Sequence, residues 1–374
     1  MSEICFNLSG GTCISTNYQQ FANKDYIQAI YNFTCEDNVN YNKLSGCFEN
    51  CLSLTSFTFK SDCKMVKIPK RFFKNCTSLK SITLPSTIEE IDESAFEGCD
   101  NLTTITHSGN LKYVNDKAFK GCVNLDVTNL LKPKVKATSQ DNTTLVIASE
   151  AYARNSLLES IDFTTKELSG ITAIENGAFA NCEKLSGITF YNEEIPSSAS
   201  ALMYIGETAF LDTVINEVKL PDKIIQIGTK AFAECNELSA VTKLNHEFPM
   251  SINSNAFLNC AKLNTLNITG SSVTTERFLY LGDLLYIPTE ADKNKKYGDI
   301  IELNDTMEES IQKQIKRNSL SSKGIDYINS NAFIGVNKSG TLHYDIKNTD
   351  NTFKEIHEKR KKVFTKPLPK NWTK

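Results

Sequence analysis

Apolar residues return along this chain with a regular spacing, and residues 79–101 show the pattern most completely. The spacing of Leu79, Ile82 and Leu84 predicts a short strand with one buried face. Pro85 ends this strand, because proline has no N–H to give to a neighbouring strand. The last third of the segment has the spacing of a single helical turn that packs on the core. The segment therefore predicts a strand, a crossing and a turn, in that order.

An aromatic residue followed three positions later by a cysteine recurs along most of the chain. The copies are Phe48/Cys51, Phe73/Cys76, Phe96/Cys99, Phe119/Cys122, Phe179/Cys182, Phe232/Cys235 and Phe257/Cys260. The residue before the cysteine is Asn or Gly in every copy except the one with Glu234. Asn and Gly adopt positive φ more readily than other residues, so this position predicts a left-handed residue that closes the turn. A period of roughly 22 to 27 residues predicts a leucine-rich-repeat solenoid.

The repeats predict one elongated α/β domain with a parallel β-sheet on one face and short helical turns or loops on the other. Residues 1–45 do not carry the repeat, and we expect them to be an N-terminal capping segment, because a solenoid leaves an apolar end exposed. The solenoid itself is expected to span residues 46–342, with a non-repeat insertion at 271–324. Residues 343–374 then form a C-terminal strand and a basic tail or cap.

The pattern L-x-x-I-x-L-P-x-x-I-x-x-I-x-x-x-A-F-x-x-C resembles the BspA-like class of leucine-rich repeats. The resemblance covers about residues 46–270, with one further copy at 325–342. Members of that family are typically surface-exposed or secreted binding and adhesion proteins. The resemblance therefore implies a binding role, while the residues themselves predict only a stacked scaffold.

Three non-repeat segments and the tail have their own patterns. Residues 130–142 are polar and contain proline, which predicts an enlarged loop between coils. Residues 278–287 suit either a degenerate coil or a hairpin, and residues 306–320 predict a helix that docks on the solenoid. Residues 351–374 carry eight Lys or Arg against two acidic residues and contain the one tryptophan. We expect this tail to fold back as a cap.

The chain has 12 cysteines, and their placement argues against a disulfide framework. Seven share one repeat position, where regular packing does not suit disulfide geometry at every step. We expect these seven to be reduced, buried thiols that act as small apolar side chains. The other five lie off this position, and a Cys5–Cys13 or Cys13–Cys35 pairing stays open: Cys5, Cys13, Cys35, Cys47 and Cys63.

No catalytic, metal-binding or cofactor-binding pattern stands out in the chain, so we expect a non-enzyme without cofactor or metal. The four histidines are scattered, and there is no H-E-x-x-H, G-x-S-x-G or phosphate-binding glycine loop. The formal net charge of −3 argues against nucleic acid as a partner. No apolar run is long enough to span a bilayer, and the N-terminus lacks the pattern of a signal peptide.

The candidate binding residues are those that point outward from the predicted strands. Side chains alternate along a strand, so the third and fifth positions of each L-x-x-I-x-L unit face solvent. In the first half of the solenoid these positions are small and mostly hydroxyl-bearing, and we expect a contiguous, rigid face there. Threonine also suits exposed strand positions without any function. The candidate ligand-binding residues are Ser81, Thr83, Thr104, Thr106, Ser160 and Asp162.

Two functional hypotheses follow from these patterns. The first is a surface adhesion or protein-binding module, located at the cell surface or outside the cell, that binds another protein or a surface glycan through this strand face. The alternative is a structural component of a larger assembly, such as a phage virion accessory protein or fibre. In that case the assembly contacts are expected in residues 1–45, 271–324 and 351–374.

Overall fold

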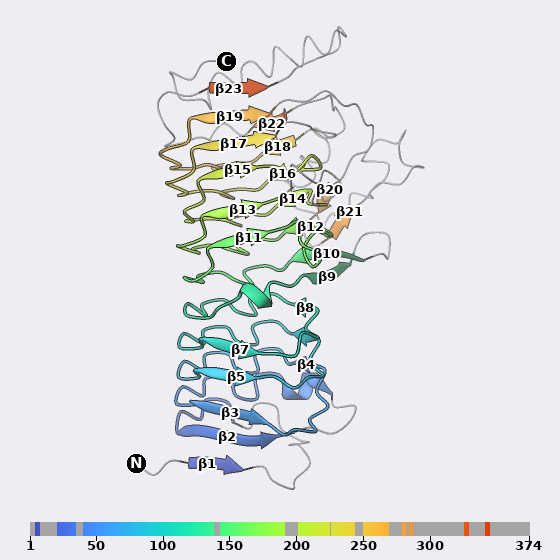
Figure 1. Cartoon of the computed structure of the whole chain (residues 1–374), viewed down its shortest axis with the longest axis vertical. Helices are drawn as coiled ribbons and strands as arrows, with labels where there is room; N and C mark the ends of the chain where they lie inside the picture. Colours follow the sequence, from blue (N-terminus) through green and yellow to red (C-terminus); the bar gives the residue numbers. More distant parts are fainter. Residues whose placement is uncertain are drawn as a thin grey trace, which may run out of the picture.

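The chain forms an elongated solenoid in which each repeat makes one coil stacked on the next (Figure 1). A computed structural model describes residues 4–7, 21–34, 40–137, 143–190, 201–224, 226–243, 250–268, 279–281, 284–286, 325–328 and 341–344. The predicted helix at 306–320 and the basic tail lie outside the described residues.

One set of strands lines one side of the solenoid and is here called the first array. Each strand comes from the L-x-x-I-x-L part of a repeat, and successive coils place these strands side by side (Figure 1). In register, Ser81, Ile82 and Thr83 stand opposite Thr104, Ile105 and Thr106 of the next coil. The first array contains β2 (Ile27–Phe33), β3 (Ser56–Phe59), β5 (Ser81–Thr83), β7 (Thr104–Thr106), β11 (Ser160–Asp162), β13 (Gly187–Thr189), β15 (Glu217–Lys219), β17 (Ala240–Lys243), β19 (Thr265–Ile268) and β23 (Thr341–Tyr344). An additional strand, β1 (Ile4–Asn7), pairs with β2 at the N-terminal end.

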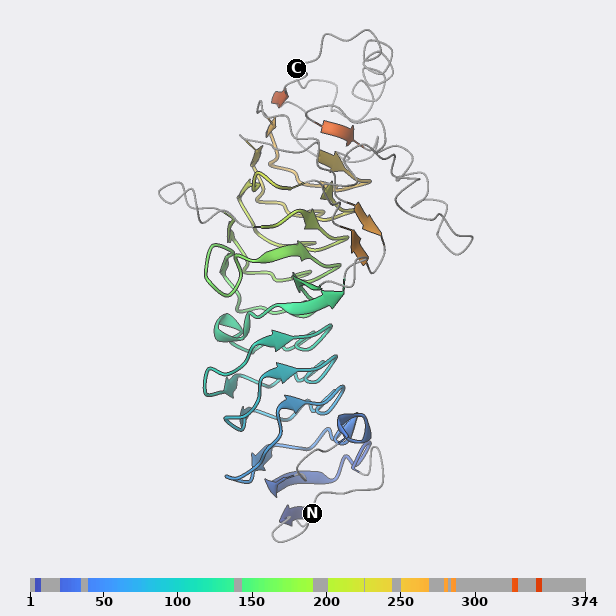
Figure 2. The same ribbon diagram turned by 90° about the vertical axis from the view of Figure 1, so that its right-hand side faces the viewer.

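A second set of strands forms another parallel array on another side of the solenoid, which Figure 2 shows face-on. The sequence does not predict this array, because several of its strands have only two residues and therefore show no alternation of apolar and polar side chains. Its parallel strands are β4 (Lys67–Ile68), β6 (Glu90–Ile91), β8 (Tyr113–Val114), β10 (Thr143–Ile147), β12 (Ile171–Ile174), β14 (Tyr204–Ile205), β16 (Gln226–Ile227), β18 (Met250–Ile252) and β22 (Ile325–Ile328). The solenoid therefore has two parallel strand arrays where the sequence predicts a single sheet.

The predicted helical turns are not α-helical. The described residues contain only two short 3₁₀ helices, η1 (Tyr41–Leu44) and η2 (Thr128–Leu130), and no α-helix. Within a turn segment, alternate amides bond in different directions: Cys76 donates to the carbonyl of Phe73 at 3.0 Å, whereas Phe73 donates to Ala95 of the next coil at 2.8 Å. Because every second N–H goes to the neighbouring coil, the run of i to i−4 bonds that defines an α-helix does not form.

Two residues with positive φ flank each turn segment. Asn75 has the left-handed conformation that its place before the cysteine predicts, with φ of 58°. A second left-handed residue lies four positions earlier and was not predicted, because residues of many types occupy that position. Arg71 is one example, with φ of 55°. This second position carries a conformational cost that the stacked amides between coils offset.

A column of stacked aromatic rings forms the centre of the core. Neighbouring rings have centroids 5.2 to 6.0 Å apart. This confirms the predicted repeat position of the aromatic residue, and the column also contains Phe21, Tyr152 and Phe210, which no cysteine follows three positions later. The column consists of Phe21, Phe48, Phe73, Phe96, Phe119, Tyr152, Phe179, Phe210, Phe232 and Phe257.

The non-repeat segments join the solenoid in two places. The predicted enlarged loop at 130–142 is wrong in part, because β9 (Lys134–Ala137) pairs antiparallel with β10. The region 278–287 contains an antiparallel pair, β20 (Leu279–Leu281) and β21 (Leu284–Tyr286), as in the hairpin alternative. Beyond the insertion, β22 and β23 pair in parallel with β18 and β19, so the chain resumes the same two arrays.

Candidate recognition surface

The six candidate residues are all exposed and all lie in strands of the first array. Ser81 and Thr83 on β5 stand opposite Thr104 and Thr106 on β7. Ser160 and Asp162 lie on β11, opposite Gly187 and Thr189 of β13. The alternation predicted from the sequence is therefore present in both pairs of strands.

The outward side chains rest on a buried row from the same strands. Ile82, Ile105 and Ile161 point inward and are at most 8% exposed. Their burial fixes the strand register, since a shift by one residue would bring these isoleucines to solvent and the hydroxyls to the core. The surface hydroxyls are thus presented at fixed spacing by packed backbone.

The hydroxyls of β5 and β7 are not used by the fold. Within the described residues, the side chains of Ser81, Thr83, Thr104 and Thr106 make no hydrogen bond to the protein. Thr103, one position before β7, differs: its Oγ1 donates to the carbonyl of Lys80 at 3.0 Å and links two coils. The sequence does not distinguish these two kinds of threonine, and the structure does.

Asp162 has a local structural role that the sequence did not reveal. Its Oδ1 accepts hydrogen bonds from the backbone N–H of Thr164 at 2.8 Å and from the hydroxyl of the same residue at 2.7 Å. These bonds shape the turn after β11, as Asp side chains commonly do. The carboxylate remains exposed.

The candidate residues form two groups rather than the contiguous row expected. The coil between β7 and β11 has no strand in the first array, and η2 takes its place. Figure 1 shows η2 between β7 and β11, and Figure 2 shows it at the edge of the solenoid. We call Ser81, Thr83, Thr104 and Thr106 the hydroxyl patch. The residues of β11 belong to a separate surface beyond η2.

The cysteine column lies inside the solenoid and provides no reactive surface. All seven repeat cysteines are free and buried, as predicted. Each thiol donates to the carbonyl of the aromatic residue one coil earlier; the Sγ–O distance is 3.1 Å from Cys99 to Phe73, for example. Burial raises the pKa of the Cys51 thiol to about 11 and that of Cys182 to about 12. The cysteine is therefore a hydrogen-bond donor in the core as well as a small apolar side chain.

Two positions of this column carry polar residues that sequence analysis did not single out. Asn155 is fully buried, and its Nδ2 donates to the carbonyls of Cys122 and Leu125 at 3.1 and 2.7 Å. Thr213 donates to the carbonyl of Phe210 at 3.1 Å. Counting forward from the aromatic residue identifies both positions, since each lies three residues after a member of the ring column.

The remaining cysteines fall into two classes. Cys47 and Cys63 are buried thiols. Cys13 and Cys35 lie outside the described residues, and Cys5 is placed in β1 without a described side chain. The pairings left open by the sequence stay predictions.

On other sides of the solenoid, several pairs of charged side chains join adjacent coils. Lys74 lies 3.0 Å from Glu97, and Lys70 lies 2.6 Å from Glu93, both between one turn segment and the next. Such half-exposed pairs each contribute little, typically below about 1 kcal/mol. They show that charge in the first half of the solenoid serves stacking, while the hydroxyl patch carries none.

The described residues hold no cluster of three or more His, Cys, Asp or Glu side chains suited to a metal ion. Within the same residues, no helix has the length and apolar character needed to cross a membrane.

Comparisons with known proteins agree with the repeat pattern. A family model described as "BspA type Leucine rich repeat region (6 copies)" matches residues 44–146 and 145–280. No curated protein matches the chain. Among solved structures, a leucine-rich repeat protein from Bacteroides ovatus is 17% identical, with 72% of this chain and 82% of that chain covered and a TM-score of 0.40. A leucine rich cell surface protein from Faecalibacterium prausnitzii is 18% identical, with coverages of 68% and 76% and a TM-score of 0.35. A leucine-rich repeat protein of T. pallidum is 19% identical, with coverages of 59% and 71% and a TM-score of 0.25.

Proposed function

Because this chain belongs to the BspA-type leucine-rich-repeat family, we propose that it is a non-catalytic recognition module that binds another protein through its strand face. The family match supports a protein-binding or adhesion role in general. We propose that the binding surface is the hydroxyl patch on β5 and β7. We further propose that the module acts at the cell surface or outside the cell.

One observation carries the proposal: the four hydroxyls of the hydroxyl patch are exposed and make no bond within the described protein. Each hydroxyl offers one donor and two acceptor positions to a partner. The paired, packed strands hold these groups in place before binding, which lowers the entropy lost on association. Small side chains also let a partner surface approach the sheet closely.

The patch is uncharged, which indicates how a partner is recognised. A charged patch gains on-rate through electrostatic steering, and that gain falls with salt. The hydroxyl patch has no charge of its own, so we propose that affinity comes from shape and hydrogen bonds. Binding is then expected to depend only weakly on salt concentration.

The test is a pull-down of surface proteins with variants that block one group at a time. Thr83→Lys/Thr104→Lys places two long cations on the hydroxyl patch, and Ser160→Lys places one on β11. Leu52→Lys/Val66→Lys is the matched control, because both of these residues are exposed and lie outside the first-array strands. Loss of the partner in the first variant alone supports the hydroxyl patch.

Other results assign the surface differently. Loss in the Ser160→Lys variant alone moves the site to β11, and loss in all three variants including the control indicates nonspecific charge effects. Retention of the partner by all variants contradicts the strand face as the binding surface.

A further inference from the structure

One coil of the solenoid, from Cys122 to Asn155, interrupts both strand arrays at once. In the first array, η2 replaces the strand that would lie between β7 and β11. In the second array, β8 does not pair with β10, because the antiparallel strand β9 lies on the edge of β10. A single backbone bond from Val114 N to the carbonyl of Pro133, at 3.1 Å, joins the two parts there. Among the described coils, no other lacks strand pairing in both arrays.

In the first array one backbone bond remains on each side of this coil, from Asp126 N to the carbonyl of Thr103 at 3.2 Å and from Ser156 N to the carbonyl of Val123 at 3.1 Å. The turn segments continue across this coil without a break. Lys117, Phe119 and Gly121 donate to the carbonyls of Ser149, Ala151 and Ala153 at 2.8 to 2.9 Å. Lys117 and Lys120 both pair with Glu150 on the same side. The backbone connection between the two halves is therefore concentrated along one side of the solenoid.

The ring column is also loosest here. The centroids of Phe119 and Tyr152 are 6.0 Å apart and their planes differ by 30°. Every other neighbouring pair in the column is closer, and none is more tilted than 24°. Ring stacking thus contributes less to this contact than to the others.

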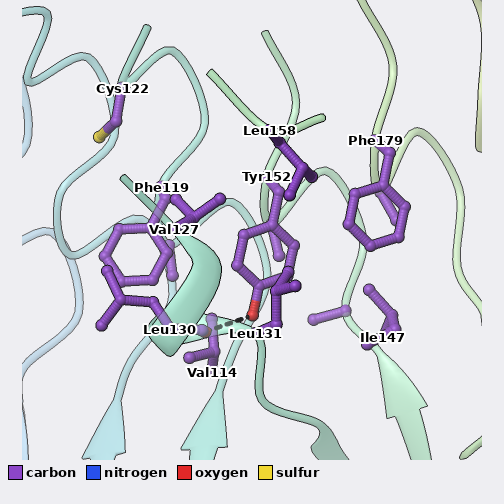
Figure 3. Close-up of a cluster of buried hydrophobic side chains, with 14 of the residues drawn as sticks. Val114, Phe119, Cys122, Val127, Leu130, Leu131, Ile147, Tyr152, Leu158 and Phe179 are labelled. Carbon is purple, nitrogen blue, oxygen red and sulfur yellow. Dashed lines mark hydrogen bonds between the residues drawn. The ribbon is translucent and has the colours of Figure 1, made fainter. Parts of the chain in front are cut away.

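Side-chain hydrogen bonds stabilise the interior of this coil, where hydrogen bonds between strands are few. The Tyr152 hydroxyl donates to the carbonyl of Leu130, the last residue of η2, at 2.8 Å (Figure 3). The same hydroxyl accepts from the N–H of Lys132 at 3.0 Å. Asn155 adds its two bonds to the carbonyls of Cys122 and Leu125, at the start of the same coil. Tyrosine and asparagine occupy these two core positions only at this coil among the coils described.

The family model matches the chain in two regions, 44–146 and 145–280, which overlap within β10. The end of one match and the start of the next therefore fall inside this coil.

We propose that the coil 122–155 is a bending joint between two rigid blocks, residues 21–121 and 156–268, with the turn segments as its axis. In a solenoid, each coil contacts only its neighbours, so stiffness at any point depends on the connections between two coils. Two of the three backbone connections are reduced to single hydrogen bonds at this joint. Bending about the third changes the angle between the hydroxyl patch and the surface of β11 and β13, which lie on opposite sides of the joint.

The experiment compares distance distributions between spin labels across the joint and within one block. Thr83→Cys/Thr189→Cys spans the joint, and Ser160→Cys/Thr265→Cys spans the same number of coils within the second block. Both pairs are placed in the full chain with Cys5, Cys13 and Cys35 replaced by serine, since the buried thiols do not take up label. Double electron–electron resonance then reports the width of each distribution.

The joint predicts a distribution at least about twice as wide across it as within the block. Tyr152→Phe removes only the hydroxyl and is expected to widen the cross-joint distribution further, leaving the within-block width unchanged. Ile227→Val is the control, because it loosens the core of the second block away from the joint. Equal widths for the two pairs, or equal widening by Tyr152→Phe and Ile227→Val, overturn the proposal.

Discussion

The interior of the solenoid and the hydroxyl patch both follow the sequence repeat, but their polar groups differ in hydrogen bonding. Inside, the thiol of Cys99 satisfies the carbonyl of Phe73, and the pattern recurs in coil after coil. On the surface, the hydroxyls of Thr104 and Thr106 satisfy nothing within the described protein. Periodicity alone therefore does not separate structure from function. The hydrogen bonds that a repeated residue makes, or leaves unmade, do separate them.

The largest contrast is expected in thiol reactivity. Burial raises the pKa of the Cys51 thiol to about 11, and it raises the pKa of Cys76 and Cys99 as well. Only the thiolate reacts, so a rise of about two pH units lowers the reactive fraction about 100-fold at pH 8, before access is considered. Titration with a thiol reagent should modify the repeat cysteines only after unfolding. Rapid native labelling of Cys51, Cys76 or Cys99, identified by mass spectrometry, contradicts the buried column.

The next largest effect is on stability, through the ring column. Phe96 stacks between Phe73 and Phe119 and is fully buried. Phe96→Ala should lower the free energy of unfolding by about 3 to 5 kcal/mol. Thr83→Ala on the surface should cost well under about 1 kcal/mol. Chemical denaturation of both variants measures the difference, and equal midpoints mean that the register of the repeat is wrongly assigned.

A smaller effect is expected at the left-handed positions, where two glycines form a matched pair. Gly98 has φ of 72°, and a Cβ there would overlap the Oδ1 of Asn75 in the preceding coil. Gly109 has φ of 86°, and a Cβ there would meet open space. Gly109→Ala should therefore cost about 1 to 2 kcal/mol from backbone strain alone, and Gly98→Ala should cost more. Denaturation midpoints in the reverse order contradict the stacked geometry of these turns.

Much of the fold could be predicted from the sequence because the core repeats. The positions of Phe96, Cys99 and Ile82 follow from period and alternation, and the structure confirms their burial. The second array could not be predicted, since the two residues of β6 are too few to show a pattern. The helical turns were wrongly predicted, because the spacing around Phe96 suits a helix whether its amides bond within the turn or to the next coil.

The sequence predicted that the candidate residues are exposed on strands, but it did not predict that they form two separate groups. Alternation is local, so it places Thr104 and Ser160 outward correctly. Whether those residues share one surface depends on the coil between them, and η2 separates them there. Asp162 was chosen as an exposed carboxylate, while its bonds to Thr164 depend on a turn that no periodic pattern encodes.

The most direct measurement removes only the hydroxyls of the patch. Thr83→Val/Thr104→Val/Thr106→Val keeps the shape and strand propensity of each residue and deletes three hydroxyl groups. Because these hydroxyls make no bond within the described fold, the free energy of unfolding should change by less than about 0.5 kcal/mol. The Kd for a captured partner should rise about tenfold or more, the equivalent of about 1.4 kcal/mol of lost hydrogen bonding. An unchanged Kd, or a loss of stability above about 1 kcal/mol, would show that these hydroxyls serve the fold rather than a partner.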